Sequence, residues 1–127
     1  SGARTHIEAG LEIEATDYGR ARRFQEMLRA EVEAAFGAVD VLLSPSVPFT
    51  APFEDPKIDD GGDSEMLASG YANVSGHPSL SLPCGMADGL PVGLQLTGPL
   101  GRDTRLLSLA EAVQSIVSTA NPRRSPA

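Results

Sequence analysis

Few residue types in this chain could do covalent chemistry, and the first is His77. With Asp40 and either Ser44 or Ser46, it could form a Ser-His-Asp arrangement, in which the imidazole takes the proton of the serine hydroxyl. The sequence has no Gly-x-Ser-x-Gly turn of the kind that presents a nucleophilic serine. His77 also precedes Pro78, so the favoured interpretation is that it is an ordinary turn residue.

Cys84 is the only cysteine of the chain and could act as a nucleophile. It lies at a predicted strand, where a cysteine is usually inert packing. One cysteine cannot form an internal disulfide and is too little for a structural zinc site. We therefore expect a protein of a reducing compartment that holds no metal through this residue.

Acidic residues in the middle of the chain could suggest a calcium site. Their spacing does not match the Asp-x-Asp-x-Asp-Gly loop, and no glutamate occupies its twelfth position, so a solvated acidic loop is favoured. The segments 89–93 and 98–101 lack the spacing and the lysine of phosphate loops, and Lys57, the only lysine, lies in the acidic loop. We expect neither a metal nor a cofactor. The acidic residues are Glu54, Asp55, Asp59, Asp60 and Asp63.

The composition excludes several classes of partner. The chain has 127 residues, enough for one domain, and its net charge of −7 argues against nucleic-acid and anionic-membrane partners. Hydrophobic residues make up 41%, which is enough for a folded core. Ser1–His6 has no apolar segment of a signal peptide, and the uncharged run Met66–Ala87 contains prolines and glycines that a spanning helix would not tolerate. A cytoplasmic protein is the simplest expectation.

Three helices are predicted from apolar periodicity. A short one starts with a capping box of Thr5 and Glu8 and ends near Ile13. A long one runs from Thr16 or Asp17 to Gly37, where glycine would take a left-handed conformation, and charged residues fill the face opposite its apolar stripe. A last one starts at Asp103 or Thr104. Its stripe of Leu106, Leu109, Ala110, Val113 and Val117 is widened by Leu107 and Ile116, so we expect burial on more than one side.

Three strands are predicted between these helices. Val39–Leu43 is apolar and predicts a buried strand, whereas Ser79–Pro83 and Val92–Thr97 flank an Asp-Gly hairpin turn. Pro83 and Pro91 should lie at strand ends or on an edge, because proline has no amide to donate. A short helix is predicted from Asp63 or Ser64 to about Tyr71, and residues 121–127 should form a flexible tail. The fold class is therefore α/β, with about three strands and three to four helices.

Several blocks of residues, in this order and spacing, resemble the C-terminal part of an amidase signature enzyme. The resemblance covers about Arg4 to Ser118. One block alone would be weak, but the set makes a chance match very improbable. The blocks are Asp17–Phe24, Phe36–Pro48 with Ala51-Pro52, Asn73–Gly85, Asp88–Pro99 and Asp103–Ala110.

The resemblance implies a fold with a mixed β-sheet flanked by helices. It also implies an enzyme that hydrolyses carboxylic amides through a Ser–cis-Ser–Lys triad and needs no cofactor. In the family all three triad residues lie upstream of the matched blocks. This sequence has no Gly-Gly-Ser-Ser-Gly-like run, and Lys57 is in the wrong place. Residues 1–120 would then be an incomplete domain that is inactive alone. It would complete the sheet and substrate pocket of an N-terminal catalytic portion, its expected partner.

The subfamily and the pocket residues follow from the segment before the Gly-Pro turn. Asp63–Leu67 departs from the longer acidic and aromatic stretch that the tRNA-dependent amidotransferases carry in their amidase chains, which favours a hydrolase of small amides. In relatives this region walls the acyl pocket, so we expect Tyr71 or Asn73 to reach the substrate. The alternative, which is favoured, is that Asn73 hydrogen-bonds the turn backbone and Tyr71 only packs.

Two other functions remain open at this stage. One is a non-catalytic interaction module that keeps the amidase fold and works as a homo-oligomer. The other, less favoured, is an independent hydrolase that uses His77. The role as an incomplete amidase domain predicts poor solubility alone and rescue by the N-terminal portion, because an incomplete sheet exposes apolar faces and open edges.

Overall fold

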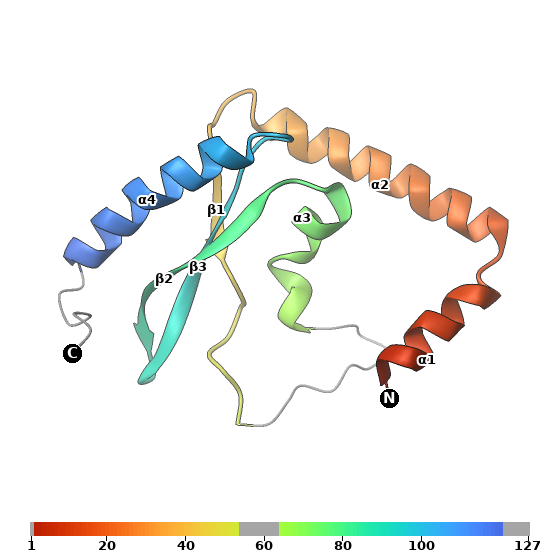
Figure 1. The fold of residues 1–127 in the computed structure, drawn as a ribbon, viewed down its shortest axis with the longest axis horizontal. Coiled ribbons are helices and arrows are strands. Elements are labelled where there is room, and N and C mark those ends of the chain that lie inside the picture. Colours follow the sequence, from red (N-terminus) through yellow and green to blue (C-terminus); the bar gives the residue numbers. More distant parts are fainter. Residues whose placement is uncertain (1, 54–63, 121–127) are drawn as a thin grey trace.

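The computed structural model describes residues 2–53 and 64–120, and in this part the fold is α/β, as predicted (Figure 1). A three-stranded sheet lies at the centre, with α4 on one face and α3 on the other. The elements in chain order are α1 (Gly2–Ala9), the 3₁₀ segment η1 (Gly10–Glu12), α2 (Ala15–Ala35), β1 (Leu42–Pro45), η2 (Ser64–Leu67), α3 (Gly70–Ser75), β2 (Ser79–Ala87), β3 (Leu90–Thr97) and α4 (Asp103–Ala120).

The hairpin of β2 and β3 confirms the predicted turn. Asp88 and Gly89 both have positive φ angles, 52° and 78°, as a two-residue turn of the hairpin type requires. The sheet order is β1-β3-β2, and both pairings are antiparallel. Pro83 lies in the edge strand β2, where the register shifts, and Pro91 pairs with Met86 beyond the reach of β1. Both prolines thus lie where a missing amide donor is tolerated, as predicted.

The prediction for the first strand was wrong in its bounds and its burial. Strand β1 is Leu42–Pro45 instead of Val39–Leu43, because Leu42 pairs with Thr97 and β3 has no residue beyond it to pair with the chain before Leu42. The strand is also an edge, and Leu43 is 59% exposed.

The outer edge of β1 is open within the described residues. The Ser46 amide donates to the Gly93 carbonyl at 3.0 Å. Because hydrogen-bonded pairs alternate along antiparallel strands, the amide of Leu43 points away from β3. An unpaired edge of this kind is a surface on which another strand can add.

The core is small and lies between the hairpin and α4. Its centre is Leu96, which is completely buried. Helix α4 begins at Asp103, as predicted, and buries Leu106 and Ala110. Leu107 and Ile116 are 60% and 69% exposed, so the expectation that this helix is buried on more than one side is wrong for the described chain. The other core members are Leu82 with the partly buried Val41, Leu80, Leu94 and Val113.

The predicted start of the first helix was wrong. Helix α1 begins at Gly2, so Thr5 lies inside it and is no cap. The carboxylate of Glu8 is instead paired with Arg4 at 2.8 Å, an i,i+4 contact on the helix surface. The following 3₁₀ segment ends at Glu12, close to the predicted end at Ile13. Ile7 and Leu11 share a face as predicted, but both are exposed.

The long helix α2 is confirmed, including its stop before Gly37, although the left-handed conformation predicted for this glycine was wrong. It begins at Ala15 and ends at Ala35, and Phe36 is its C-cap in a right-handed conformation. Gly37 therefore follows the cap as part of a turn, and its φ is not positive. None of the 21 residues of α2 is fully buried, so apolar packing alone does not hold this helix.

The sheet face opposite α4 is polar, and its close packing gives the first prediction. A Cβ added at Gly93 would lie 2.6 Å from the Ser46 hydroxyl and 2.7 Å from the Ser81 hydroxyl, and these two hydroxyls are hydrogen-bonded to each other. The variant Gly93→Ala should therefore lower the free energy of unfolding by about 1–3 kcal/mol, measured by urea denaturation.

The matched control is Gly10→Ala, since a Cβ there meets nothing within 4 Å. Equal effects of the two substitutions would contradict the close packing over Gly93.

Candidate functional site

The segment around Tyr71 and Asn73 is divided differently from the prediction. The single helix predicted from Asp63 or Ser64 to Tyr71 is two elements, η2 and the short α3. Helix α3 has six residues, and its C-cap is Gly76, whose φ of 79° is left-handed. Glycine is suited to this position because it has no Cβ to clash there.

Tyr71 packs against the polar face of the sheet. Its hydroxyl lies 2.8 Å from the Thr97 hydroxyl, which lies 3.1 Å from that of Ser79. Thr97 is completely buried, so this chain of hydroxyls fixes α3 on the hairpin. Asn73 is exposed, and its side chain makes no hydrogen bond with the turn backbone or any other described residue.

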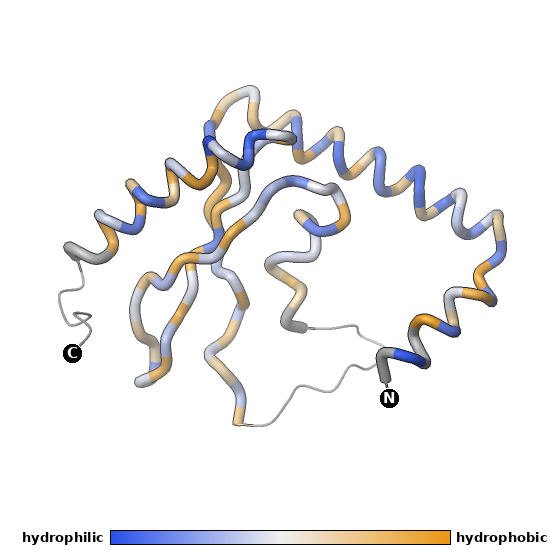
Figure 2. The backbone as a smooth tube through the Cα atoms, viewed as in Figure 1, coloured by the Kyte–Doolittle hydropathy of each residue, from blue (hydrophilic) through white to orange (hydrophobic). Residues whose placement is uncertain are grey.

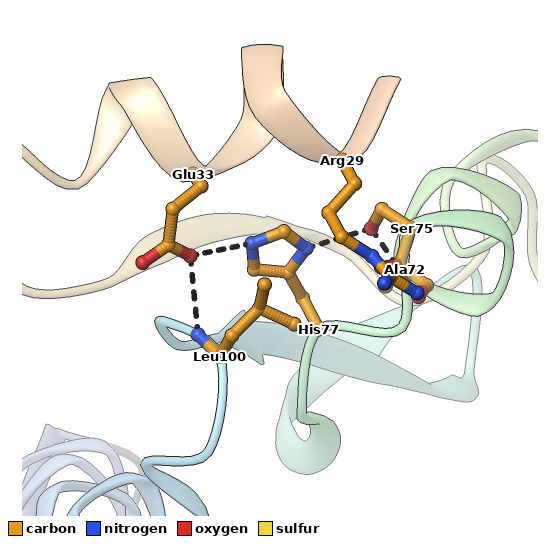
Figure 3. A network of polar contacts seen from close by, with 6 residues as sticks. All are labelled: Arg29, Glu33, Ala72, Ser75, His77 and Leu100. Carbon is orange, nitrogen blue, oxygen red and sulfur yellow. Dashed lines mark hydrogen bonds and ion pairs between the residues drawn. The ribbon is translucent and has the colours of Figure 1, made fainter. Parts of the chain in front are cut away.

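The imidazole of His77 is completely buried and bonded at both nitrogens (Figure 3). Nδ1 lies 2.8 Å from the Ser75 hydroxyl, and Nε2 lies 2.9 Å from a carboxylate oxygen of Glu33 on α2. The ring of Phe36 stacks on it with 5.6 Å between centroids. His77 is therefore neither an ordinary turn residue nor a free base.

The Ser-His-Asp arrangement considered from the sequence is wrong. The Ser44 hydroxyl is buried without a partner among the described residues, and the Ser46 hydroxyl is bonded to Ser81. The carboxylate of Asp40 pairs with Arg105 at 2.6 Å. None of these groups is hydrogen-bonded to His77, whose two nitrogens are bonded to Ser75 and Glu33 instead, so Asp40, Ser44 and Ser46 form no relay through it.

Three polar residues of α2 bond to the C-terminal end of α3 and to residues that follow it, and the sequence prediction missed all three. Gln25 donates to the Val74 carbonyl at 2.8 Å, and Nε of Arg29 donates to the Ser75 carbonyl at 2.7 Å. Glu33 accepts from Nε2 of His77 and also from the Leu100 amide at 3.2 Å. The prediction assigned charged residues of this helix to solvent. The available signal was their spacing of four residues, which puts Gln25, Arg29 and Glu33 on one face.

Hydrogen bonds lower the pKa of Glu33. The largest cause is the Leu100 amide, followed by the bond from His77, because both donors favour the charged carboxylate. The Ser75 hydroxyl also lies 3.4 Å from the Ala72 carbonyl. The Ser75 hydroxyl can therefore donate to Nδ1 when that nitrogen carries no proton. When Nδ1 is protonated, the hydroxyl can accept from it and donate to the Ala72 carbonyl.

An open pocket of about 470 Å³ lies beside β1. Its lining includes the apolar side chains of Leu43, Val47, Phe49 and Leu94. Cys84, on β2 as expected, also lines it; its thiol is free and lies 3.6 Å from the Val92 carbonyl. Among the described residues no charged side chain lines this pocket, so it is a surface suited to apolar groups.

Residues 2–53 and 64–120 hold neither a metal cluster nor a membrane-spanning helix. No group of three His, Cys, Asp or Glu side chains there could ligate a metal ion. None of the helices in these ranges is long and apolar enough to span a bilayer. Lys57, the predicted acidic loop and the predicted tail 121–127 fall largely or wholly outside the described residues.

Comparison with known proteins decides the family. The profile of a family described as Amidase matches residues 4–107. This chain belongs to the amidase family. The resemblance noted from the sequence is thereby confirmed, and the α/β fold agrees with solved amidase structures.

Curated relatives and solved structures match most of this chain but only part of their own length. The A subunit of the glutamyl-tRNA(Gln) amidotransferase of Thermus thermophilus is 43% identical over 105 residues, which are 82% of this chain and 22% of that protein. A crystal structure of an amidase has 31% identity and a TM-score of 0.73, over 90% of this chain and 28% of the other.

A bacterial aryl acylamidase of the amidase signature family supports the fold alone. Its structure has 23% identity and a TM-score of 0.67, over 96% of this chain and 26% of the other. Across these comparisons the chain spans about a quarter of each protein that it matches.

The Glu33 carboxylate predicts an acid-sensitive contribution to stability. Because its pKa is lowered in the folded chain, the stabilisation is complete above the ordinary carboxyl pKa and is lost as the pH falls through the lowered value. Glu33→Gln should therefore flatten the acid limb of a plot of urea midpoint against pH. Glu31→Gln, at an exposed position of the same helix, is the control and should leave that limb unchanged.

The hydroxyl of Tyr71 predicts a second effect on stability. Tyr71→Phe removes its bond to Thr97 and should lower the free energy of unfolding by about 1 kcal/mol. Tyr18→Phe is the control, since Tyr18 is 62% exposed. Calorimetry of the two variants checks this, and an equal response would show that the hydroxyl pair adds nothing.

Proposed function

We propose that this chain is the C-terminal segment of an amidase signature domain that hydrolyses carboxylic amides to an acid and ammonia or an amine. The observation that carries the proposal is the match itself: residues 4–107 fit the amidase family, while the matched part of the chain spans 22% of its Thermus thermophilus relative. Residues 1–120 would complete the sheet and one side of the substrate pocket.

The distribution of apolar side chains supports this proposal. Among the described residues, five hydrophobic residues are buried, whereas large ones on α1, α2, β1 and α4 are exposed. Figure 2 shows hydrophobic and hydrophilic residues interspersed along the helices. Exposed apolar surface beyond isolated side chains usually marks an interface. The open edge of β1 and the apolar pocket beside it fit a strand and side chains from the rest of such a domain.

The catalytic groups would come from that other portion. The resemblance to the family implies a Ser–cis-Ser–Lys triad upstream of the matched blocks, and this sequence has no serine- and glycine-rich run of that kind. His77 offers no substitute base, because its imidazole and the Ser75 hydroxyl bonded to it are both buried. The expected partner is therefore the N-terminal catalytic portion, and the substrate is an amide.

The substrate class has two candidates. Segment Asp63–Leu67 favours a hydrolase of small amides, and the amidase structure at 31% identity is consistent with that. The relatives at 36% to 43% identity are named as A subunits of glutamyl-tRNA(Gln) amidotransferases, which favours the second candidate, a glutamine amidase within an amidotransferase. Both candidates cleave a carboxylic amide.

The proposal is tested by complementation. The chain is assayed alone and after mixing with the preceding portion of the Thermus thermophilus relative, and ammonia release is measured from glutamine and from small aliphatic and aryl amides. We expect activity in the mixture only, and the preferred amide separates the two candidates.

Activity of the chain alone would contradict the proposal. A folded mixture with no activity would also contradict it, and would favour the alternative of a non-catalytic, oligomeric module.

The pocket-wall residues give a prediction for the complemented enzyme. Both residues lie on α3, just before the Gly76–Pro78 turn, so as pocket-wall residues Asn73→Ala and Tyr71→Ala should each lower kcat/KM by about tenfold, or about 1.4 kcal/mol, for several amides. Val74→Ala, at a neighbouring exposed position, is the control. Unchanged kcat/KM in both variants would reduce these residues to packing.

A further inference from the structure

We propose that Arg29 and His77 are positioning residues for the pocket wall. They join α2 to the end of α3 and so hold Asn73 in place. The inference rests on the proposed function, because it assumes that α3 faces the substrate. Whether the two residues hold α3 in place can, however, be measured without any amidase activity.

Helix α3 cannot hold its own position. It has six residues, and isolated helices of this length are not stable in water. The carbonyls of its last turn have no partner within the helix. Gln25 and Arg29 supply donors to the carbonyls of Val74 and Ser75, and the cation of Arg29 also lies at the end of a helix where positive charge is favoured.

His77 fixes the same end of α3 through a side chain. Its Nδ1 holds the hydroxyl of Ser75, the last residue of α3, and its Nε2 holds Glu33 on α2 (Figure 3). The imidazole is completely buried, so water cannot replace either bond if one partner is lost. A shift of α2 would therefore be transmitted to α3.

The approach of Arg29 also explains why glycine follows α3. A Cβ added at Gly76 would lie 3.2 Å from Nη2 of Arg29, and the φ of 79° already disfavours other residues. At the opposite end, the hydroxyl of Tyr71 is held by Thr97 on the sheet. With both ends fixed, α3 has little freedom to slide or rotate, so the backbone position of the exposed Asn73 is also fixed.

The first test is amide hydrogen exchange on the intact chain. Arg29→Met keeps the aliphatic stem and removes the donor, and Arg23→Met is the matched control on the exposed side of α2. We expect the amides of Asn73 and Gly76, which are bonded to the Ser69 and Ala72 carbonyls, to exchange at least about tenfold faster in Arg29→Met.

The β3 amides and the Arg23→Met variant should be unchanged, which separates local loosening of α3 from global unfolding. Arg29→Lys keeps the cation without the guanidinium donor, so its exchange rates at Asn73 and Gly76 should lie between those of the wild type and of Arg29→Met. Unchanged exchange at Asn73 and Gly76 in Arg29→Met would overturn the inference and leave the proposed function intact.

The second test uses the complemented enzyme. In this assembly Arg29→Met should raise KM for the amide several-fold, because it loosens the pocket wall. The value of kcat should change less, since the catalytic groups lie elsewhere. Faster exchange without any change in KM would overturn the positioning role. An inactive complemented wild type would instead overturn the proposed function, and the assignment of α3 as a pocket wall would fall with it.

Discussion

The hydrogen bond between the buried imidazole of His77 and Glu33 is the contact on which the attachment of α2 depends. Helix α2 has no fully buried residue, so apolar packing alone does not hold it. It is held instead by Glu33, Arg29 and Gln25, which bond to His77 and to the end of α3. Because polar contacts are directional and costly to leave unmade when buried, they fix the orientation of α2 more tightly than a few exposed apolar side chains could.

The same arrangement explains why the chain suits a part of a larger domain better than a domain of its own. Its core is one small cluster around Leu96 between the hairpin and α4, while β1 presents an open edge. The family match places these elements in the amidase family, and the relatives that the chain matches are several times longer than it is. In the proposed assembly the hydrogen bonds of Arg29, Glu33 and His77 hold α3 in place as a wall of the substrate pocket. The exposed apolar side chains then contact the catalytic portion.

Local sequence patterns predicted which helices and strands form better than they predicted the residues at which these begin and end. Apolar periodicity was sufficient for α2 and α4, and Asp88-Gly89 was sufficient for the hairpin, because those signals act between near neighbours. The bounds of β1 depend on where β3 ends, about fifty residues later. The pairing of His77 with Glu33 spans 44 residues and joins two polar groups, so no hydrophobic pattern could reveal it. The family was recognisable from the ordered blocks, whereas the contacts that position α3 were not.

The most direct test of the account is the exchange rate of one amide, that of Leu43. Its N–H points away from β3 and has no strand to pair with among the described residues. If the chain completes the sheet of an amidase domain, this amide should exchange freely in the chain alone. Once the N-terminal catalytic portion is bound, it should become strongly protected. A Leu43 amide that still exchanges freely in a catalytically active assembly would contradict the account.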